Sequence, residues 1–206
     1  TPLERPLLVT LHGSYITLEE ASEATVAAIL ANVSAFVYTA ERNLEFFAAR
    51  GLATDGFRKM ANAMPADPRP APFTREELGI GAEDVVFTLV ARGIKRKGWR
   101  ASVIAFRALV ETHGFTNAHL LMIGEGEATD DARRRAEGLA GVHFLGYRSE
   151  INGIFRLSDV VLLPTRFDGE SYPLVIVQAL QEGRPVIATD LGEIGTMISE
   201  GGAPAG

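Results

Sequence analysis

Short unbroken apolar runs along this chain alternate with longer stretches in which apolar residues recur every three or four positions. The first pattern is typical of strands buried on both faces of a parallel sheet, and the second is typical of amphipathic helices. In the C-terminal part, the runs predict strands at residues 85–90, 120–123, 142–145, 160–163 and 186–188. Helical stretches separate them, so we expect a Rossmann-like, doubly wound parallel sheet with helices on both faces.

The helix after the first of these strands has the clearest period. Trp99, Val103, Phe106 and Val110 are spaced to share one helical face, and Gly114 follows as a stop signal. Further helices are predicted at residues 130–139, 150–157 and 173–182. Each helix connects two predicted strands, which is the connection that a parallel sheet requires.

The N-terminal part shows a shorter version of the same alternation. Strands are predicted at residues 7–11 and 35–38, and a third short strand at 57–61. One helix is expected to begin at Thr17, where Glu20 completes a capping box. A second helix is expected over residues 41–50, with Gly51 as its stop. These elements predict part of a second α/β domain.

A proline-rich stretch separates the two parts of the chain. Proline lacks the backbone N–H and fixes φ, so this stretch is expected to form a stiff, extended connector at about residues 62–74. We therefore predict two domains, residues 1–65 and residues 66–206. The prolines of the connector are Pro65, Pro68, Pro70 and Pro72.

Composition narrows the classes of protein. The 206 residues are 47% hydrophobic and carry a net charge of −6, which argues against nucleic-acid binding. Cysteine is absent and the four histidines show no ligand spacing, so we expect no disulfide and no metal site. No apolar run reaches the ~18 residues that span a bilayer. The chain begins at Thr1 and ends in a glycine-rich stretch, so we expect both ends to be cut from a longer protein.

Positive charge gathers after the first strand of the C-terminal part. Arg92 follows that strand, Lys97 comes five residues later, and Lys95, Arg96 and Arg100 complete the cluster. Ligands of open parallel sheets bind beyond the carboxyl ends of the strands, and a diphosphate needs such charge compensation. The alternative interpretation of this cluster is a solvated basic turn.

Two glycines follow the second strand of the same part. Gly124 and Gly126 allow a backbone to approach a ligand closely, although tight turns use the same pattern. Thr129 interrupts the dinucleotide fingerprint Gly-x-Gly-x-x-Gly, which argues against NAD and FAD. Tyr147 and Arg148 follow the third strand directly after Gly146.

An acidic loop before the last predicted helix is the most informative stretch. Glu170 stands at the start of that helix, where backbone N–H groups bind anions and hydroxyls, and Gln178 follows eight residues later. The loop resembles the Glu-x7-Glu signature of retaining, nucleotide-sugar-dependent glycosyltransferases of the GT-B fold and group 1 type. Gln178 replaces the second glutamate. The Arg-x4-Lys-Gly pattern at Arg92, Lys97 and Gly98 is similar to the segment of these enzymes that grips the donor diphosphate.

The resemblance implies a role for each matching position. Arg92 and Lys97 would bind the diphosphate, and Glu170 the donor sugar, with His12 facing that sugar from the other domain. Gln178 would accept bonds from the ribose hydroxyls. The remaining implied donor contacts are the base-pocket residues Tyr147 and Arg148, the glycines Gly124 and Gly126, and the loop residues Ser171, Tyr172 and Leu174, whose backbone N–H groups would meet the sugar and distal phosphate.

The resemblance also implies the function. The chain would be the donor-binding region and part of the acceptor domain of an enzyme that transfers a sugar from a nucleoside diphosphate sugar to a hydroxyl of a glycan or lipid-linked acceptor. It would use no cofactor and no metal, and the fragment alone would be inactive. Polysaccharide biosynthesis and a cytoplasmic location are implied, with or without peripheral association of the full-length parent at the inner face of the membrane.

Three other interpretations stay open from the sequence. A nucleotide-sugar epimerase shares the GT-B fold, but it needs additional acid/base carboxylates that the sequence does not reveal. A catalytically silent nucleotide-sugar-binding domain is suggested by the neutral Gln178. A flavodoxin-like regulatory domain would leave Arg92, Lys97 and Glu170 unexplained.

Overall fold

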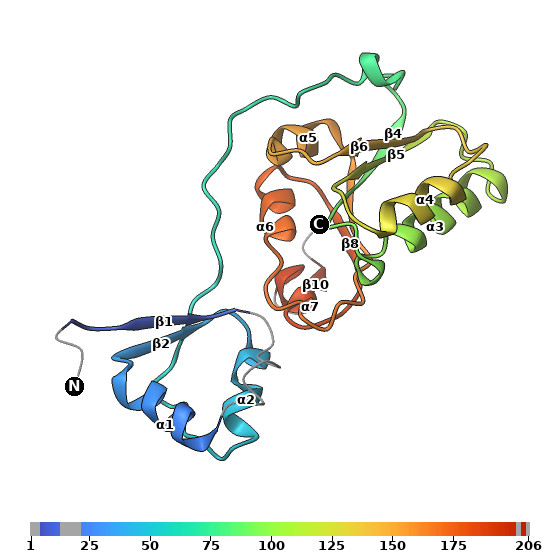
Figure 1. Ribbon diagram of the computed structural model, residues 1–206. Helices are drawn as coiled ribbons and strands as arrows, with labels where there is room; N and C mark the ends of the chain where they lie inside the picture. The colour runs from blue at the N-terminus through green and yellow to red at the C-terminus, as the bar shows by residue number, and fades with distance from the viewer. Residues whose placement is uncertain (1–4, 13–21, 201–202, 205–206) are drawn as a thin grey trace. The chain divides into compact units, whose positions relative to one another are not determined.

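The computed structural model describes residues 5–12, 22–200 and 203–204 (Figure 1). The chain folds as two compact units, each of which is described by itself below. The first unit comprises Thr1–Ala63 together with Asp168–Pro173 and Asp190–Gly195. The second unit comprises Met64–Phe167, Leu174–Thr189 and Thr196–Gly206. The assignment of acceptor and donor roles to two domains stays a prediction.

The second unit contains a five-stranded parallel sheet in the order β6-β5-β4-β7-β8. All five strands were predicted from their apolar runs. In β4 and β5, side chains at alternate positions point into two separate cores, as expected for strands covered on both faces. The edge strand β8 differs, since its Ile187 is 60% exposed. The strands are β4 Val85–Val90, β5 Ala118–Ile123, β6 Val142–Gly146, β7 Val160–Leu163 and β8 Val186–Ala188.

Helices cover both faces of this sheet (Figure 1). On one face, Trp99 and Val103 pack with Leu89, Leu120 and Met122 of the strands. The opposite face has its own core, which includes Val86, Leu121 and Ile154. The prediction of a doubly wound α/β fold is confirmed. The helices of the first face are α3 Trp99–Glu111 and α4 Ala128–Arg135, and those of the second are α5 Ile151–Leu157 and α6 Leu174–Gln181.

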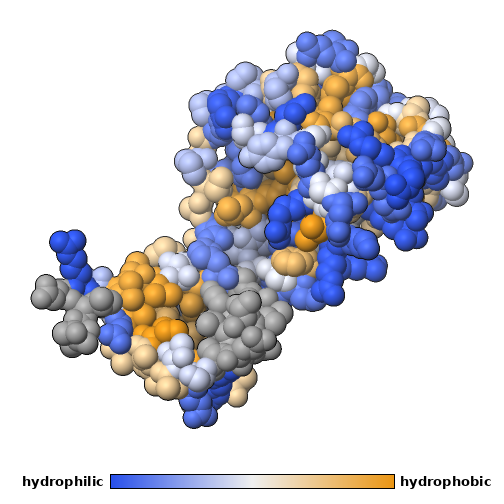
Figure 2. Space-filling model, viewed as in Figure 1, coloured by the Kyte–Doolittle hydropathy of each residue, from blue (hydrophilic) through white to orange (hydrophobic). Residues whose placement is uncertain are grey.

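The outer surfaces of α3 and α4 are hydrophilic (Figure 2). The helix α4 carries Asp130 and Asp131 in its first turn and arginines at positions 133–135 in its last turn, where each charge complements the helix dipole. Both helices are therefore amphipathic, with their apolar residues in the core beside the sheet.

The first unit has a smaller parallel sheet in the order β1-β2-β3. Its core is aromatic: Phe36 stacks on Phe57 with ring centroids 4.4 Å apart, and Phe47 meets both rings edge-on. The prediction of a partial second α/β domain agrees with these elements. They are β1 Leu8–Leu11, α1 Glu23–Asn32, β2 Ala35–Tyr38, the 3-10 helix η2 Glu41–Leu44, α2 Glu45–Ala48 and β3 Arg58–Lys59.

Several predicted boundaries shift in the structure. The predicted helix start at Thr17 and its capping partner Glu20 lie outside the described residues. The described helix α1 begins at Glu23, and the Ser22 hydroxyl caps it by accepting from the Thr25 backbone N–H at 3.2 Å. The single helix predicted over residues 41–50 is two short helices, η2 and α2. The helix predicted at 130–139 runs from Ala128 to Arg135.

The remaining elements are short. Between Lys59 and Glu76 the described chain forms no helix or strand, as the prolines predicted. No strand was predicted near the glycine-rich end of the chain, but a two-stranded antiparallel pair forms there. The additional elements are the 3-10 helices η3 Glu76–Leu78 and η4 Lys95–Lys97, the helix α7 Ile194–Met197, and the strands β9 Ser199–Glu200 and β10 Ala203–Pro204.

Candidate functional site

The strand order of the second unit reverses at β4. This strand pairs with β5 on one side and with β7 on the other. The sheet therefore grows from β4 toward β6 on one side and toward β8 on the other. Ligands of open α/β sheets bind in the crevice beyond the carboxyl ends of the strands at such a switch point. The segments that follow β4, β5 and β7 are therefore the place to look for a site.

Two glycines hold these segments in backbone contact. Gly98 has φ +85°, and a Cβ atom there would lie 2.5 Å from the Pro164 carbonyl oxygen after β7. Gly124 has φ +129°, and its Cβ would lie 2.0 Å from the Ala91 carbonyl oxygen after β4. A larger residue at either position would push the loops apart, so these glycines shape the carboxyl edge of the sheet.

The structure brings Arg92 and Lys97 to one aromatic ring. The Lys97 ammonium lies 4.8 Å from the centroid of the Phe167 ring, and the Arg92 guanidinium carbon lies 5.7 Å from it. The indole N–H of Trp99, on α3, donates to the Arg92 carbonyl at 2.9 Å and so holds the loop after β4. No role was predicted for Phe167, because its contact with both cations depends on the pairing of β4 with β7.

A cavity of about 400 Å³ lies beside Arg92 at the ends of β4, β5 and β6. Gly124, Tyr147 and Arg148 line it together with Arg92, so four of the predicted site residues surround one space. Its remaining wall residues are Val90, Ala91, Ile123, Glu125, Ser149 and Ile151.

The loops around this cavity are tied to one another by hydrogen bonds. The Glu125 carboxylate accepts from the Tyr147 backbone N–H at 3.3 Å, which links the loops after β5 and β6. Gly126 lies on the same loop as Glu125, and its carbonyl accepts from the Thr129 hydroxyl at 2.7 Å. Tyr147 is 69% exposed, so its side chain is accessible to a ligand.

The other cations of the basic cluster lie apart from this cavity. Lys95 and Arg100 border two further cavities of about 520 and 550 Å³, one of which also includes Arg96. The cluster that looked continuous in the sequence is therefore divided between different surfaces, and only Arg92 among these residues lines the cavity at the switch point.

Gln178 lies on α6 of the second unit, and Leu174 begins that helix directly after Pro173. The Gln178 side chain donates from Nε2 to the Oδ1 of Asn152, on α5, at 3.0 Å. Asn152 was not singled out in the sequence, and an isolated asparagine in a helix carries no signal that would have found it. The ribose contact of Gln178 stays a prediction.

The acidic loop belongs to the first unit by its contacts. Glu170 is 6% exposed, and its carbonyl accepts from the Arg42 guanidinium at 2.8 Å. The Ser171 hydroxyl lies 3.1 Å from Asn43 Nδ2, and the Tyr172 carbonyl accepts from Asn62 at 3.1 Å. These side chains hold the loop in place. The roles predicted for Glu170, Ser171 and Tyr172 stay predictions.

His12 also belongs to the first unit. It follows β1 directly and is exposed, so its imidazole is accessible, as the predicted contact with a donor sugar requires. The contact of His12 with a donor sugar stays a prediction.

Within residues 5–12, 22–200 and 203–204, histidine and acidic side chains form no group of three or more that could hold a metal ion. Of the helices in the same parts of the chain, none combines the length and apolar character needed to cross a bilayer.

Doubly wound sheets bind ligands beyond the carboxyl ends of their strands at the switch point, and this chain places Arg92 and Lys97 there. Residues 84–205 match the family described as Glycosyl transferases group 1. The matched span is more than half of the chain, and the chain belongs to this family. The predicted family is thereby confirmed.

Similar proteins support this assignment. The D-inositol 3-phosphate glycosyltransferase of Corynebacterium glutamicum is 30% identical over 146 residues, which cover 66% of this chain and 34% of that protein. The phosphatidyl-myo-inositol mannosyltransferase of Mycolicibacterium smegmatis is 32% identical over 111 residues, which cover 52% of this chain and 28% of that protein. The chain thus spans about a third of the length of these relatives.

A solved structure shows the likeness of fold. The crystal structure of HepE from Anabaena, in complex with UDP and glucose, matches 96% of this chain and 56% of its own chain with a TM-score of 0.73 and 21% sequence identity. Together with the parallel sheets described above, this match confirms the predicted α/β, GT-B-like fold.

Proposed function

We propose that this chain carries the donor-binding part of a retaining glycosyltransferase, which transfers a sugar from a nucleoside diphosphate sugar to an acceptor hydroxyl. One observation carries the proposal. Arg92 and Lys97 meet at the Phe167 ring, at the carboxyl end of β4, and Arg92 also lines the adjacent cavity of about 400 Å³. Two cations at a switch point suit a diphosphate, and the cavity beside them suits a nucleoside.

The proposed site divides the donor among its residues. Arg92 and Lys97 bind the diphosphate, and they stabilise the negative charge that develops on it as the sugar leaves. Tyr147 and Arg148 meet the base, while Gly124 and Gly126 let the backbone approach the nucleotide. The amino end of α6, at Leu174, contributes the positive end of a helix dipole.

The proposed reaction retains configuration at the anomeric carbon. The bond from that carbon to the diphosphate oxygen breaks, and the acceptor oxygen bonds to the same face of the sugar. The acceptor proton passes to the departing diphosphate, so no protein nucleophile is required. Glu170 and His12 contact the sugar. Because side chains supply the positive charge, we propose that neither a metal nor a cofactor takes part.

The acceptor is proposed only by class. The relatives named above carry inositol phosphate and phosphatidyl-inositol in their names, which supports a hydroxyl on a phosphorylated or lipid-linked acceptor. A lipid-linked acceptor would place the longer protein at the inner face of the membrane, without requiring a helix that crosses it.

Titration calorimetry of this chain with UDP, GDP, ADP and TDP tests the proposal. Each charge-assisted contact contributes about 1.5–3 kcal/mol, so the double variant Arg92→Ala/Lys97→Ala should lose most of the affinity of the best ligand. Excess chelator should leave the affinity of the unaltered chain unchanged.

The matched control is the double variant Lys95→Ala/Arg100→Ala. It removes the same charge from side chains that border the other cavities. Equal losses in the two double variants would show a general electrostatic attraction and would overturn the diphosphate assignment.

A catalytically silent nucleotide-sugar-binding domain is the second candidate. The observation that favours it is the neutral Gln178, whose amide nitrogen is already bonded to Asn152. Transfer of labelled sugar to a hydroxyl acceptor, assayed with the protein that contains this sequence, separates the two. Donor binding without transfer or hydrolysis would support the silent domain.

A further inference from the structure

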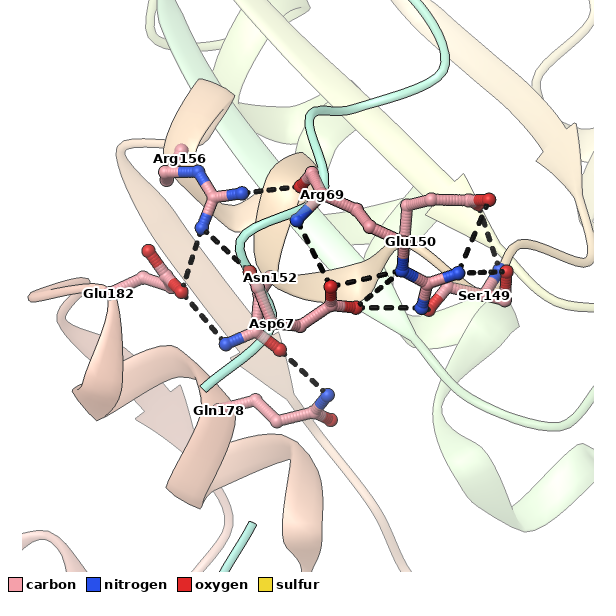
Figure 3. A network of polar contacts seen from close by, with 8 residues as sticks. All are labelled: Asp67, Arg69, Ser149, Glu150, Asn152, Arg156, Gln178 and Glu182. Atoms are coloured by element: carbon pink, nitrogen blue, oxygen red, sulfur yellow. Dashed lines mark hydrogen bonds and ion pairs between the residues drawn. The ribbon is translucent and has the colours of Figure 1, made fainter. Parts of the chain in front are cut away.

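Four polar side chains join α5 to α6 and to the residue that follows α6. Gln178 donates from Nε2 to Asn152 Oδ1 at 3.0 Å, and Asn152 donates from Nδ2 to Glu182 Oε1 at 2.8 Å. Arg156 pairs with the same Glu182 oxygen at 3.0 Å. We call these four residues the α5–α6 network (Figure 3). All of them belong to the second unit.

Glu182 fixes the direction of every hydrogen bond in the network. A carboxylate paired with Arg156 accepts hydrogen bonds and donates none. Asn152 must therefore turn its Nδ2 toward Glu182, and its Oδ1 then faces Gln178. Gln178 must in turn present Nε2 to Asn152. Because Asn152 is only 1% exposed, water cannot replace either partner of its amide.

The network fixes the orientation of the Gln178 amide oxygen, Oε1, which does not bond to Asn152. With Nε2 held by Asn152, the amide oxygen Oε1 points away from Asn152, as Figure 3 shows. Gln178 is half-buried, and its hydrogen bond to Asn152 fixes the orientation of this oxygen. An amide oxygen in this state accepts a hydrogen bond and cannot act as a donor.

We propose that Asn152 and Glu182 are positioning residues for the nucleotide, which hold Gln178 Oε1 ready to accept a hydrogen bond from a ribose hydroxyl. This inference rests on the proposed function, which supplies the ribose. It also accounts for the glutamine at position 178. A carboxylate there would face the Asn152 oxygen, and rotating the Asn152 amide would turn that oxygen against Glu182 instead.

A swap of the two side chains tests the proposal. Gln178→Glu alone places a carboxylate at each end of Asn152. In the double variant Gln178→Glu/Glu182→Gln, Asn152 can rotate its amide, donate to residue 178 and accept from residue 182. The substitution at 178 should therefore weaken nucleotide binding and lower Tm in the unaltered background. When Glu182→Gln is also present, Gln178→Glu should leave nucleotide binding and Tm unchanged, or should increase both.

Two ligands separate positioning from folding. The nucleoside diphosphate that binds best among UDP, GDP, ADP and TDP contains ribose, whereas inorganic pyrophosphate offers the same phosphates without it. Gln178→Glu and Asn152→Leu should each lower the affinity for the nucleoside diphosphate by about tenfold. This is the size of a typical coupling between contacting residues. The affinity for pyrophosphate should stay unchanged. Equal losses for both ligands would overturn the ribose role.

Gln181→Glu is the charge control, since Gln181 is the only other glutamine in the sequence and lies exposed on the same helix. Its Nε2 donates to the Met64 carbonyl at 2.7 Å and the variant loses that bond, so this control is compared by nucleotide affinity and not by Tm. It adds the same charge without touching Asn152. An effect of Gln178→Glu on Tm that is identical with and without Glu182→Gln would overturn the network. If the unaltered chain binds neither nucleoside diphosphates nor pyrophosphate, the proposed function is wrong, and so is the ribose role of Gln178. The Tm values still show whether Gln178 and Glu182 are coupled through Asn152.

Discussion

At the scale of single residues, Phe167 is the side chain that both cations of the proposed diphosphate site contact. Arg92 and Lys97 both approach its ring, within the range at which a cation is attracted by an aromatic face. The ring holds two like charges near each other before any ligand arrives. An incoming diphosphate would therefore meet cations that are already in position, which lowers the cost of ordering them.

Replacing Phe167 by leucine should weaken binding of the best nucleoside diphosphate by up to about five- to thirtyfold, because each of the two cations loses about 0.5–1 kcal/mol of attraction to the ring. Leucine keeps an apolar side chain, so the fold should persist. Calorimetric titration measures the change. Phe115→Leu, at an exposed phenylalanine beyond α3, is the control and should leave affinity unchanged. Unchanged affinity in Phe167→Leu would show that the ring is not needed to order the cations.

At the scale of elements, the proline-rich connector is fastened to α5. The Arg156 guanidinium donates to the carbonyl of Asp67 at 3.2 Å and to the carbonyl of Arg69. The Arg69 side chain in turn hydrogen-bonds the Asp67 carboxylate and lowers its pKa. The connector is thus extended, as its prolines require, and part of the second unit's surface. Since Arg156 also pairs with Glu182, the connector shares a side chain with the α5–α6 network.

Gly153→Ala should destabilise the protein, although alanine is normally the better helix former by about 1 kcal/mol. Gly153 lies in α5, and a Cβ atom there would be 2.4 Å from the Ala71 backbone nitrogen of the connector. Overpacking of this kind costs about 1–3 kcal/mol, so a Tm lower by several degrees is expected in a thermal melt.

Gly56→Ala serves as the control, because a Cβ there meets nothing within 4 Å. It should change the free energy of unfolding by no more than about 0.5 kcal/mol. A stabilised Gly153→Ala variant would show that the connector does not pack on α5 in solution.

At the scale of the whole molecule, the sheet of the second unit has different chemistry at its two ends. The basic residues lie beyond the carboxyl ends of the strands. At the amino ends, His119 of β5 lies 3.1 Å from His143 of β6 and 3.1 Å from the Asp84 carboxylate before β4. Burial, and then the neighbouring His119, lowers the pKa of His143. The backbone N–H of Gly81, and then His119, holds the pKa of Asp84 below its ordinary value.

The lowered pKa of His143 makes stability depend on pH near neutrality. The unfolded chain, in which a histidine titrates near about 6.5, binds this proton more readily than the folded protein. The free energy of unfolding should therefore fall as the pH drops below that value, and level off below the folded pKa. Asp84 acts in a separate window, since its stabilising contribution is lost only below about pH 4.

Thermal melts between pH 7.5 and 5 measure this dependence. On acidification, the Tm of the His143→Gln variant should decrease less than the Tm of the unaltered chain. His113→Gln, at an exposed histidine, should follow the unaltered chain. Parallel curves for all three proteins would contradict the assignment to His143.

Local patterns in the sequence determined the regular framework. Strands β4 to β8 were found because each contains a short run of apolar residues, as strands of a sheet covered on both faces do. The helix α3 was found because Trp99, Val103 and Phe106 share one face, and the connector because prolines exclude helix and sheet. Arg92 and Gly124 were found as candidates because each follows the end of a strand, where ligands of open α/β sheets bind. Gln178 was found because its spacing from Glu170 resembles the signature of the family.

Tertiary structure alone decided which of these residues touch. Phe167 meets Arg92 because β7 pairs with β4, and Gln178 meets Asn152 because α5 and α6 cover the same face of the sheet. Contacts between distant positions depend on strand order, which local spacing does not encode. The orientation of the Gln178 amide is set by Glu182 through Asn152, because a buried amide must match donors to acceptors on both sides.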